Sequence, residues 1–184
     1  MRIRKATMRD IPALLELING YASQGVMLPR TEFEMAESLR DFLLVEDGGA
    51  IAACGALHFY TPASGEIRSL AVDRAWQGRG LGRQLAAQLE EEARQCGLEL
   101  LFLFTYVPRF FEKLGYREVD RSELPLKAWK DCMRCPKFQC CDEVAMVKYL
   151  DRPEVVEAAI RGELEAFHRD PESVLIRLPA LKGR

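Results

Sequence analysis

A glycine-rich turn that joins an apolar strand to a helix constrains this fold more than any other part of the sequence. Residues 70–72 (LAV) predict the end of a strand, and residues 77–82 (QGRGLG) follow after a short link. From Gly82 to Gln95, apolar residues recur at the spacing of an amphipathic helix. Glycines let the backbone approach a ligand closely, and the first amides of a helix have no partner within it. The positive end of the helix dipole lies there too, so the turn is a predicted phosphate or pyrophosphate site.

Two common nucleotide motifs do not fit this turn. A dinucleotide fingerprint needs a third glycine where Arg83 stands, and a P-loop needs a Gly-Lys pair followed by Ser or Thr. The charge balance, 26 basic against 28 acidic residues, offers no positive field for nucleic acid. No apolar run approaches the roughly 18 residues of a membrane span, and the N-terminus lacks the apolar stretch of a signal peptide. We therefore expect a cytoplasmic protein without nucleic-acid or membrane partners.

The length and the residue pattern predict one mixed α/β domain. A chain of 184 residues, 48% of them apolar, can bury a core without disulfides. The pattern predicts helices over 7–20, 31–39, 82–95 and shortly after 108, and strands over 3–6, 42–46, 51–60, 66–72, 98–104, 116–120 and 144–150. We expect residues 1–150 to form the domain, with a cysteine-rich loop at 124–142, and residues 151–184 to form a C-terminal helix and tail.

Two motifs in the right order resemble the GNAT acetyltransferases. Gln77, Gly80 and Gly82 match that family's acyl-CoA signature, [Gln/Arg]-x-x-Gly-x-[Gly/Ala], and residues 110–116 (FFEKLGY) stand where the family has Phe-Tyr-Glu-Lys-Leu-Gly-Phe. The resemblance extends over most of the chain. It implies the GNAT fold, a central mixed antiparallel and parallel sheet flanked by helices on both faces, and acetyl-CoA as the acetyl donor.

The resemblance also implies where acetyl-CoA binds. The backbone of the predicted strand would pair with the pantetheine arm, and the loop amides with Gln77 would hold the pyrophosphate. Phe111 takes the place of the family's frequent general-acid tyrosine, and phenylalanine has no proton to give. Thr105, Tyr106 or a water is therefore the expected acid. The expected cofactor-binding residues are Leu70, Ala71, Val72, Gln77, Gly78, Arg79, Gly80, Leu81, Gly82 and Phe111.

Two further segments resemble the N-acetylglutamate synthase branch of the family. Residues 25–31 (GVMLPRT) resemble its Gly-Val-Leu-x-x-Arg-Ser segment, and residues 65–72 (GEIRSLAV) resemble its Glu-Leu-x-Cys-Leu-Ala-Val strand. This implies acetylation of the α-amine of L-glutamate, the first step of arginine biosynthesis, by direct transfer in a ternary complex. We expect a short, stand-alone form without the kinase-like domain of long synthases, and the resemblance makes a homodimer an expected assembly.

The expected reaction assigns roles to several side chains. Glu66 is the candidate base for the amine, the alternative being a solvated strand-end carboxylate. The backbone amide of Leu70 or Val72 would bind the oxyanion. Thr105 and Tyr106, at the end of the strand that follows, complete the candidate catalytic residues with Glu66.

The two carboxylates of glutamate call for arginine, which captures a carboxylate with two hydrogen bonds. Arg30 is the first candidate, although an exposed surface charge is the common alternative. Arg68 is expected to share one strand face with Glu66 and Leu70, toward either substrate or solvent. Ser69 beside it and Lys127 in the loop complete the candidate substrate-binding residues.

Six cysteines divide into two groups. Cys54 and Cys96 stand alone and are expected to be small core residues. The other four lie within ten residues, where a Cys-x2-Cys pair can bind zinc or iron. Adjacent cysteines do not easily bind one ion together, so free thiols are favoured and no metal is assigned. The four are Cys132, Cys135, Cys140 and Cys141, and a similar pattern in the short synthases would select Cys132, Cys135 and Cys141.

Two other functions remain open on the sequence. The first is acetylation of a different amine, such as another amino acid, a polyamine or a protein amine. The second is a non-catalytic module that responds to acyl-CoA or to a metal, which Phe111 and the cysteine loop would favour.

Overall fold

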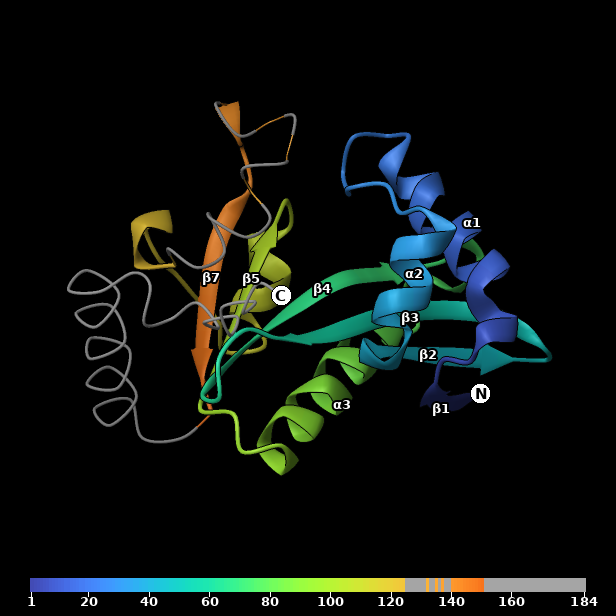
Figure 1. Cartoon of the computed structure of the whole chain (residues 1–184), viewed down its shortest axis with the longest axis horizontal. Coiled ribbons are helices and arrows are strands. Elements are labelled where there is room, and N and C mark those ends of the chain that lie inside the picture. The colour runs from blue at the N-terminus through green and yellow to red at the C-terminus, as the bar shows by residue number, and fades with distance from the viewer. Residues whose placement is uncertain (125–131, 133–134, 136, 138–139, 151–184) are drawn as a thin grey trace, which may run out of the picture. The chain divides into compact units, whose positions relative to one another are not determined.

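A computed structural model describes residues 1–124, 132, 135, 137 and 140–150, all of them within the compact unit Met1–Leu150. Lys127 and the expected tail 151–184 lie outside the described residues. The described strands form one mixed sheet in the order β1-β2-β3-β4-β5-β7-β6 (Figure 1). Their bounds are β1 Arg2–Lys5, β2 Phe42–Asp47, β3 Ala50–Phe59, β4 Ser64–Val72, β5 Leu100–Thr105, β6 Arg117–Glu118 and β7 Val144–Tyr149.

Helices cover both faces of this sheet, as the sequence predicts. One face carries α1 (Ile11–Ala22) and α2 (Glu32–Ser38), and the other carries α3 (Leu81–Gln95) and α4 (Pro108–Glu112) (Figure 1). Each face has its own hydrophobic cluster, and β3 contributes side chains to both because it is buried on both sides. In the described part of the chain, no helix is long and apolar enough to cross a membrane.

Two expectations from the pattern are wrong in detail. The strand expected over 116–120 is reduced to β6, because only Arg117 and Glu118 pair in register with β7. The N–H of Tyr116 donates instead to the carbonyl of Phe111, and Asp120 caps the short 3-10 helix Arg121–Glu123. Cys54 is fully buried, and burial raises the pKa of its thiol to about 12. Cys96, by contrast, is exposed. It follows the last helical residue of α3 and precedes Gly97, whose φ of 78° ends the helix at the surface.

The strands β4 and β5 are parallel neighbours at only one end. Residues Ser64–Glu66 pair with Leu100–Phe102, and the two strands then diverge (Figure 1). Beyond Phe102, β5 continues to pair with β7 as far as Thr105. The second half of β4 therefore has an edge that faces a gap in the sheet.

A β-bulge interrupts β4 just beyond the point of divergence. Ala56 lies opposite Arg68 and Cys54 lies opposite Ala71, so Ser69 and Leu70 together face Gly55. Ser69 has a φ of 54°, and a Cβ on Gly55 would lie 2.9 Å from the Leu70 side chain. The bulge moves Leu70 into the core cluster on the α3 side. Our expectation that Leu70 shares a face with Arg68 is therefore wrong, because the extra residue reverses the alternation.

Candidate active site

The turn between β4 and α3 forms an open pocket of about 290 Å³. Gly78 and Gly80 have φ values of 75° and 79°, and Gly80 is the N-cap of α3. A side chain would be strained at both positions, so glycine is required to present the first amides of α3 outward. The pocket is lined by Val72, Trp76, Gln77, Gly78, Gly80, Leu81, Gly82, Arg83 and Phe110.

The end of β4 aims its polar backbone groups at the gap. The N–H of Asp73 donates to the carbonyl of Ala52, so Val72 and Ala53 form a pair that shares no hydrogen bonds. The N–H and C=O of Val72 consequently face away from β3, toward the side where β5 has diverged. The hydroxyl of Tyr21 donates to this carbonyl at 2.6 Å, and the side-chain amide of Gln77 donates to the Tyr21 oxygen at 2.7 Å.

Of the two phenylalanines of α4, Phe110 and not the expected Phe111 faces the pocket. Phe110 lines the pocket and lies against the position that a side chain on Gly82 would occupy. Phe111 is only 5% exposed and packs edge-on against Phe110 and Tyr116, with ring centroids at 4.9 and 5.5 Å. Phe111, which we expected among the cofactor residues, does not line this pocket. The motif located the helix, but only the packing shows which of its two aromatic rings faces the pocket.

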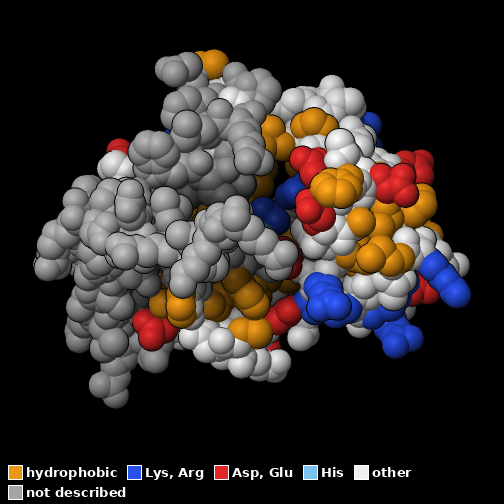
Figure 2. Space-filling model, viewed as in Figure 1, with side chains coloured by type: hydrophobic (Ala, Val, Ile, Leu, Met, Phe, Trp, Pro, Cys, Tyr) orange, Lys and Arg blue, Asp and Glu red, His pale blue; other side chains and the backbone are white. Residues whose placement is uncertain are grey.

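A polar group lies on the α1 and α2 face of β4, at the start of the gap. Glu66 is 3% exposed and stands opposite His58 of β3, while Arg68 lies one alternation further along β4. Asp41, in the short 3-10 helix after α2, accepts from His58 Nδ1 at 2.6 Å and lies 3.6 Å from Arg68 Nη2. Basic and acidic side chains are visible together beside α2 in the centre of Figure 2. Glu66 is thus a buried carboxylate, not the solvated strand end that was its alternative.

The sequence interpretation missed His58 and Asp41. A signal for His58 was present, since the hairpin of β3 and β4 sets it opposite Glu66. No sequence pattern connects Asp41 with either residue, because its position depends on how the segment after α2 packs on the sheet.

The end of β5 carries the other two candidate catalytic side chains. Thr105 is buried, and its Oγ1 accepts a hydrogen bond from the N–H of Val107 at 3.0 Å. The hydroxyl of Tyr106 donates to Asp142 at 2.8 Å and accepts from the ammonium of Lys137, also at 2.8 Å. Burial raises the pKa of Tyr106, although the hydrogen bond from Lys137 opposes that shift. The phenol therefore holds its proton at neutral pH.

Arg30 lies in the segment between α1 and α2, and its backbone is held on both sides. Its N–H donates to Asn19 Oδ1 at 2.8 Å, and Asn19 Nδ2 donates to its carbonyl at 2.9 Å. The ammonium of Lys137 also lies 3.4 Å from the carbonyl of Gly25 in the same segment. The structure thus places a described part of the cysteine-rich loop beside the segment that carries Arg30.

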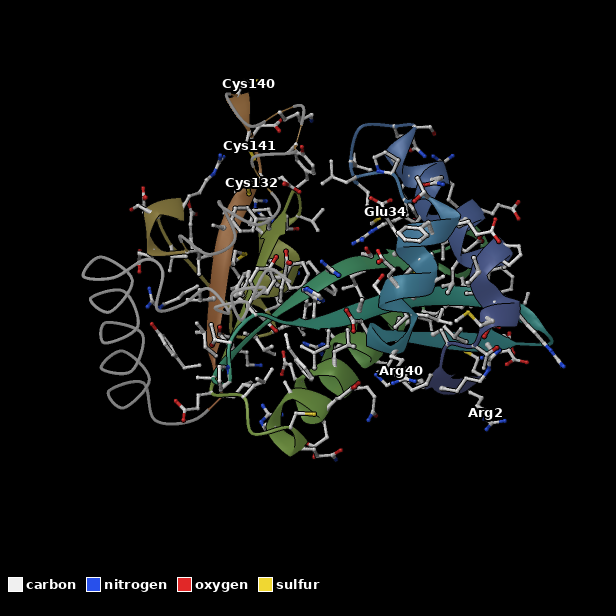
Figure 3. All side chains as sticks on the ribbon, viewed as in Figure 1. Arg2, Glu34, Arg40, Cys132, Cys140 and Cys141 are labelled. Atoms are coloured by element: carbon white, nitrogen blue, oxygen red, sulfur yellow. The ribbon has the colours of Figure 1, made fainter. Side chains whose placement is uncertain are left out.

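Figure 3 shows Cys132, Cys140 and Cys141 near the start of β7. The N–H of Cys135 donates to the carbonyl of Cys132 at 2.9 Å, which forms a tight turn, and none of the loop's four cysteines is disulfide-bonded. Across the residues that the structure describes, no group of three or more His, Cys, Asp or Glu side chains could hold a metal ion.

Comparisons with known proteins agree with this geometry. Residues 11–116, more than half of the chain, match the acetyltransferase (GNAT) family. An uncharacterized N-acetyltransferase of Chlorobaculum tepidum is 38% identical over 80% of this chain and 96% of its own length. An amino-acid acetyltransferase of Mycobacterium tuberculosis is 30% identical over 72% of this chain and 77% of its own length.

Solved structures show the same relationship. The N-acetylglutamate synthase of Neisseria gonorrhoeae, complexed with coenzyme A and N-acetyl-glutamate, superposes with a TM-score of 0.75 and 29% identity over 82% of this chain. The match covers 35% of that longer chain. A Mycobacterium tuberculosis protein in complex with CoA gives a TM-score of 0.70 and 25% identity, over 81% of this chain and 99% of its own.

A mixed sheet that parts beside a glycine-rich helix start, together with these relatives, defines an N-acetyltransferase that takes its acetyl group from acetyl-CoA. The chain belongs to the GNAT family.

Proposed function

We propose that the protein transfers the acetyl group of acetyl-CoA to the α-amine of L-glutamate, the first step of arginine biosynthesis. The observation that carries the proposal is the position of Glu66, a buried carboxylate next to Arg68 where β4 and β5 part. Relatives named amino-acid acetyltransferase support an amino acid as the acceptor. The Neisseria synthase, whose structure holds CoA and N-acetyl-glutamate, supports glutamate in particular.

In this proposal the donor lies along the open edge of β4. The exposed backbone groups of residues 70–72 pair with the pantetheine arm. The amides of residues 79–82 at the start of α3 bind the pyrophosphate, whose charge the helix dipole stabilises. Phe110, with Val72 and Trp76, gives the pocket its apolar wall.

Acetyl transfer then proceeds by direct attack in the ternary complex. The carboxylate of Glu66 takes a proton from the glutamate ammonium, and the neutral amine attacks the thioester carbon. The N–H of Val72 or Leu70 stabilises the oxyanion that forms. The attack leaves two protons on the nitrogen, so as the C–S bond breaks the nitrogen gives up one proton and the CoA thiolate takes one up, which leaves the amide and free CoA. His58, held by Asp41, lies next to Glu66 and can receive the proton that Glu66 accepts.

Thr105 and Tyr106 are the candidates that protonate the thiolate. The oxygen of Thr105 already accepts a hydrogen bond, so its own proton is free to be donated to a ligand. Tyr106 has a stronger supporting contact, because the ammonium of Lys137 would stabilise the phenolate that remains after proton transfer. Both side chains lie at the end of β5, across the gap from the open edge of β4.

Arg30 and Arg68 are proposed to bind the two carboxylates of the acceptor. Asp41 lies 3.6 Å from Arg68 and fixes the direction of its guanidinium, while Asn19 fixes the backbone of Arg30. Ser69, which lies in the bulge directly after Arg68, is also proposed to bind the acceptor. Lys127, whose position is outside the described residues, remains a proposal from the sequence.

A thiol-release assay over a panel of amines tests the proposal. L-Glutamate should give a higher kcat/KM than other amino acids, polyamines or peptides with free N-termini. Arg30→Ala should raise the KM for glutamate at least about tenfold, since a charge-assisted pair is lost. The KM for acetyl-CoA should stay within about twofold, because the donor pocket does not include Arg30.

Arg2→Ala is the matched control, because it removes an exposed arginine from the edge strand β1 (Figure 3). It should leave both KM values unchanged. Equal or greater activity on polyamines or protein N-termini would refute glutamate as the acceptor. A variant at Arg30 that raises both KM values equally would refute the role of this arginine.

A further inference from the structure

The last turn of α1 contacts both halves of the active site. Two of its residues are separated by only one position, and side chains two apart on an α-helix point about 200° apart. Tyr21 therefore reaches toward the end of β4, and Asn19 reaches toward the segment before α2. The first α-helix supports both the donor side and the acceptor side through a single turn.

On the donor side, Tyr21 joins the strand to the glycine-rich turn. Its hydroxyl donates to the carbonyl of Val72 at 2.6 Å and accepts from the amide of Gln77 at 2.7 Å. The Gln77 amide also lies 3.4 Å from the same carbonyl. The Tyr21 hydroxyl thus supplies a hydrogen-bond donor to the carbonyl of Val72. It also holds the side chain of Gln77 at the entrance to the pocket.

A second contact supports the same junction. Gln24, just beyond the end of α1, accepts a hydrogen bond from Arg74 Nη2 at 2.7 Å. Arg74 begins the short 3-10 helix that leads into the glycine-rich turn. Two polar side chains from the end of α1 therefore tie down the loop that binds the donor.

On the acceptor side, Asn19 holds the backbone of Arg30 with two hydrogen bonds, at 2.8 and 2.9 Å. Arg30 lies in no helix or strand, and the side-chain amide of Asn19 supplies the two backbone hydrogen bonds that a neighbouring strand would otherwise make. A rigid backbone limits where the guanidinium of Arg30 can reach, and such preorganisation reduces the entropy lost on binding.

We propose that this turn couples the two substrate sites, with Tyr21 as a positioning residue for the acetyl-CoA loop and Asn19 as a positioning residue for Arg30. A ligand that orders this turn from one site then lowers the conformational entropy that is lost when the second ligand binds at the other site. The acceptor half rests on the proposed function, because it needs Arg30 to bind the amino acid. The donor half stands on the geometry of the Tyr21 contacts alone.

Calorimetric titration with CoA, without any acceptor, tests the donor half. Tyr21→Phe keeps the ring and removes both hydrogen bonds of the hydroxyl, so the Kd for CoA should rise about fivefold. Tyr149→Phe is the matched control, since its hydroxyl accepts from Arg117 on the remote strand pair of β6 and β7. Binding of CoA by Tyr21→Phe with the wild-type Kd would overturn the donor half.

Gln77 provides a check that the effect runs through the named contact. Gln77→Ala and Tyr21→Phe should each weaken CoA, and the double variant should be no weaker than the worse single variant by more than about twofold. Additive losses would show that Tyr21 acts through something other than Gln77. Melting temperatures of the unliganded variants separate this from a general loss of folding.

The coupling itself is measured by repeating the CoA titration in saturating L-glutamate. For the wild type we expect glutamate to tighten CoA binding about fivefold, and linkage requires the reciprocal effect. Asn19→Ala should reduce this factor toward one while leaving CoA affinity alone unchanged. Ser23→Ala, which removes a hydrogen bond to Gly20 in the same turn, is the control that should keep the factor.

The outcomes separate the two proposals. If glutamate has no effect on CoA binding by the wild type, the coupling is overturned, whereas the thiol-release assay still decides whether glutamate is the acceptor and Tyr21→Phe still tests the donor contact. If glutamate tightens CoA in the wild type and in Asn19→Ala alike, the substrate stands and the coupling through α1 is overturned.

Discussion

The turn after β4 presents mainly backbone amides to its pocket, whereas the proposed acceptor site on the α1 and α2 face of the same strand is made of side chains. Residues 70–82 supply most of the first region in one continuous stretch. The second draws on β3, β4, the end of β5, the segment between α1 and α2, and the short helix that holds Asp41. A site built from backbone depends on chain conformation, and a site built from side chains depends on the identity of single residues.

This difference predicts opposite patterns of tolerance. Among the glycines of the donor loop, a substitution should matter only where it changes a backbone angle. On the acceptor side, a change of one functional group that leaves the shape alone should be costly. Two single substitutions and one pair of substitutions test the contrast.

The largest effect is expected for Glu66→Gln, which keeps the shape of the side chain and removes the base. We expect kcat to fall at least about a hundredfold, with the KM for acetyl-CoA little changed. The deficit should shrink as the pH rises toward the pKa of the acceptor amine, because more amine then arrives unprotonated. Steady-state kinetics across pH provides the measurement.

Glu118→Gln on the exposed strand β6 is the matched control and should behave as wild type. A kcat for Glu66→Gln within about threefold of wild type would remove Glu66 from the role of base. The acceptor side would then depend on residues other than those proposed.

An intermediate effect is expected for Asp10→Asn, which loosens the start of α1, the helix that serves both sides. The Arg4 guanidinium donates to both oxygens of Asp10, at 2.8 Å each, and holds the pKa of that carboxyl well below its usual 3.8. At pH 7 the variant should lose about 1.5 kcal/mol of unfolding free energy. Both CoA and amine affinity should fall if α1 supports both sites.

The sign of the pH dependence follows from the lowered pKa. The contribution of ionised Asp10 is fully present above the unfolded pKa near 3.8 and is lost as the pH falls toward the folded value. Urea unfolding should therefore show wild type and Asp10→Asn converging below about pH 4. A difference that stays constant from pH 7 to pH 3 would show that the pair with Arg4 does not stabilise the fold.

The smallest effect is expected from a pair of alanine substitutions on the donor side. Gly80 has a φ of 79°, so Gly80→Ala is strained and should raise the Kd for CoA about fivefold. A Cβ on Gly82 would meet Phe110 at 3.5 Å, an ordinary contact, and Gly82→Ala should change the Kd by less than about twofold. Equal losses in the two variants would show that space, not backbone angle, limits this loop.

The donor side could be predicted from sequence because its information is contiguous. The glycines fix the turn, the following periodicity fixes α3, and the two together fix the pocket. The acceptor side could be predicted only in part. Glu66 and Arg68 follow from strand alternation, but the contact of Asp41 with Arg68 depends on packing between distant segments. In the sequence, Asn19 is only one residue of the amphipathic helix expected over 7–20, and Tyr21 falls just beyond the expected end of that helix.

The sequence also could not predict that Phe110, and not Phe111, lines the pocket. Adjacent residues of a helix point about 100° apart, so a motif that fixes the helix does not fix its rotation. The reversal of Leu70 could not be predicted because a bulge leaves no hydrophobic signature of its own. Only Gly55, which makes room for Leu70 on the neighbouring strand, marks it in the sequence.

The extra residue at Ser69 and Leu70 divides β4 into two segments whose alternation is out of phase. Before it, even-numbered side chains turn toward α1 and α2, and after it they turn toward α3. Amino-acid changes before the bulge therefore reach the proposed acceptor site without reaching the wall of the donor pocket. A deletion of one residue at the bulge would restore a single alternation along the strand.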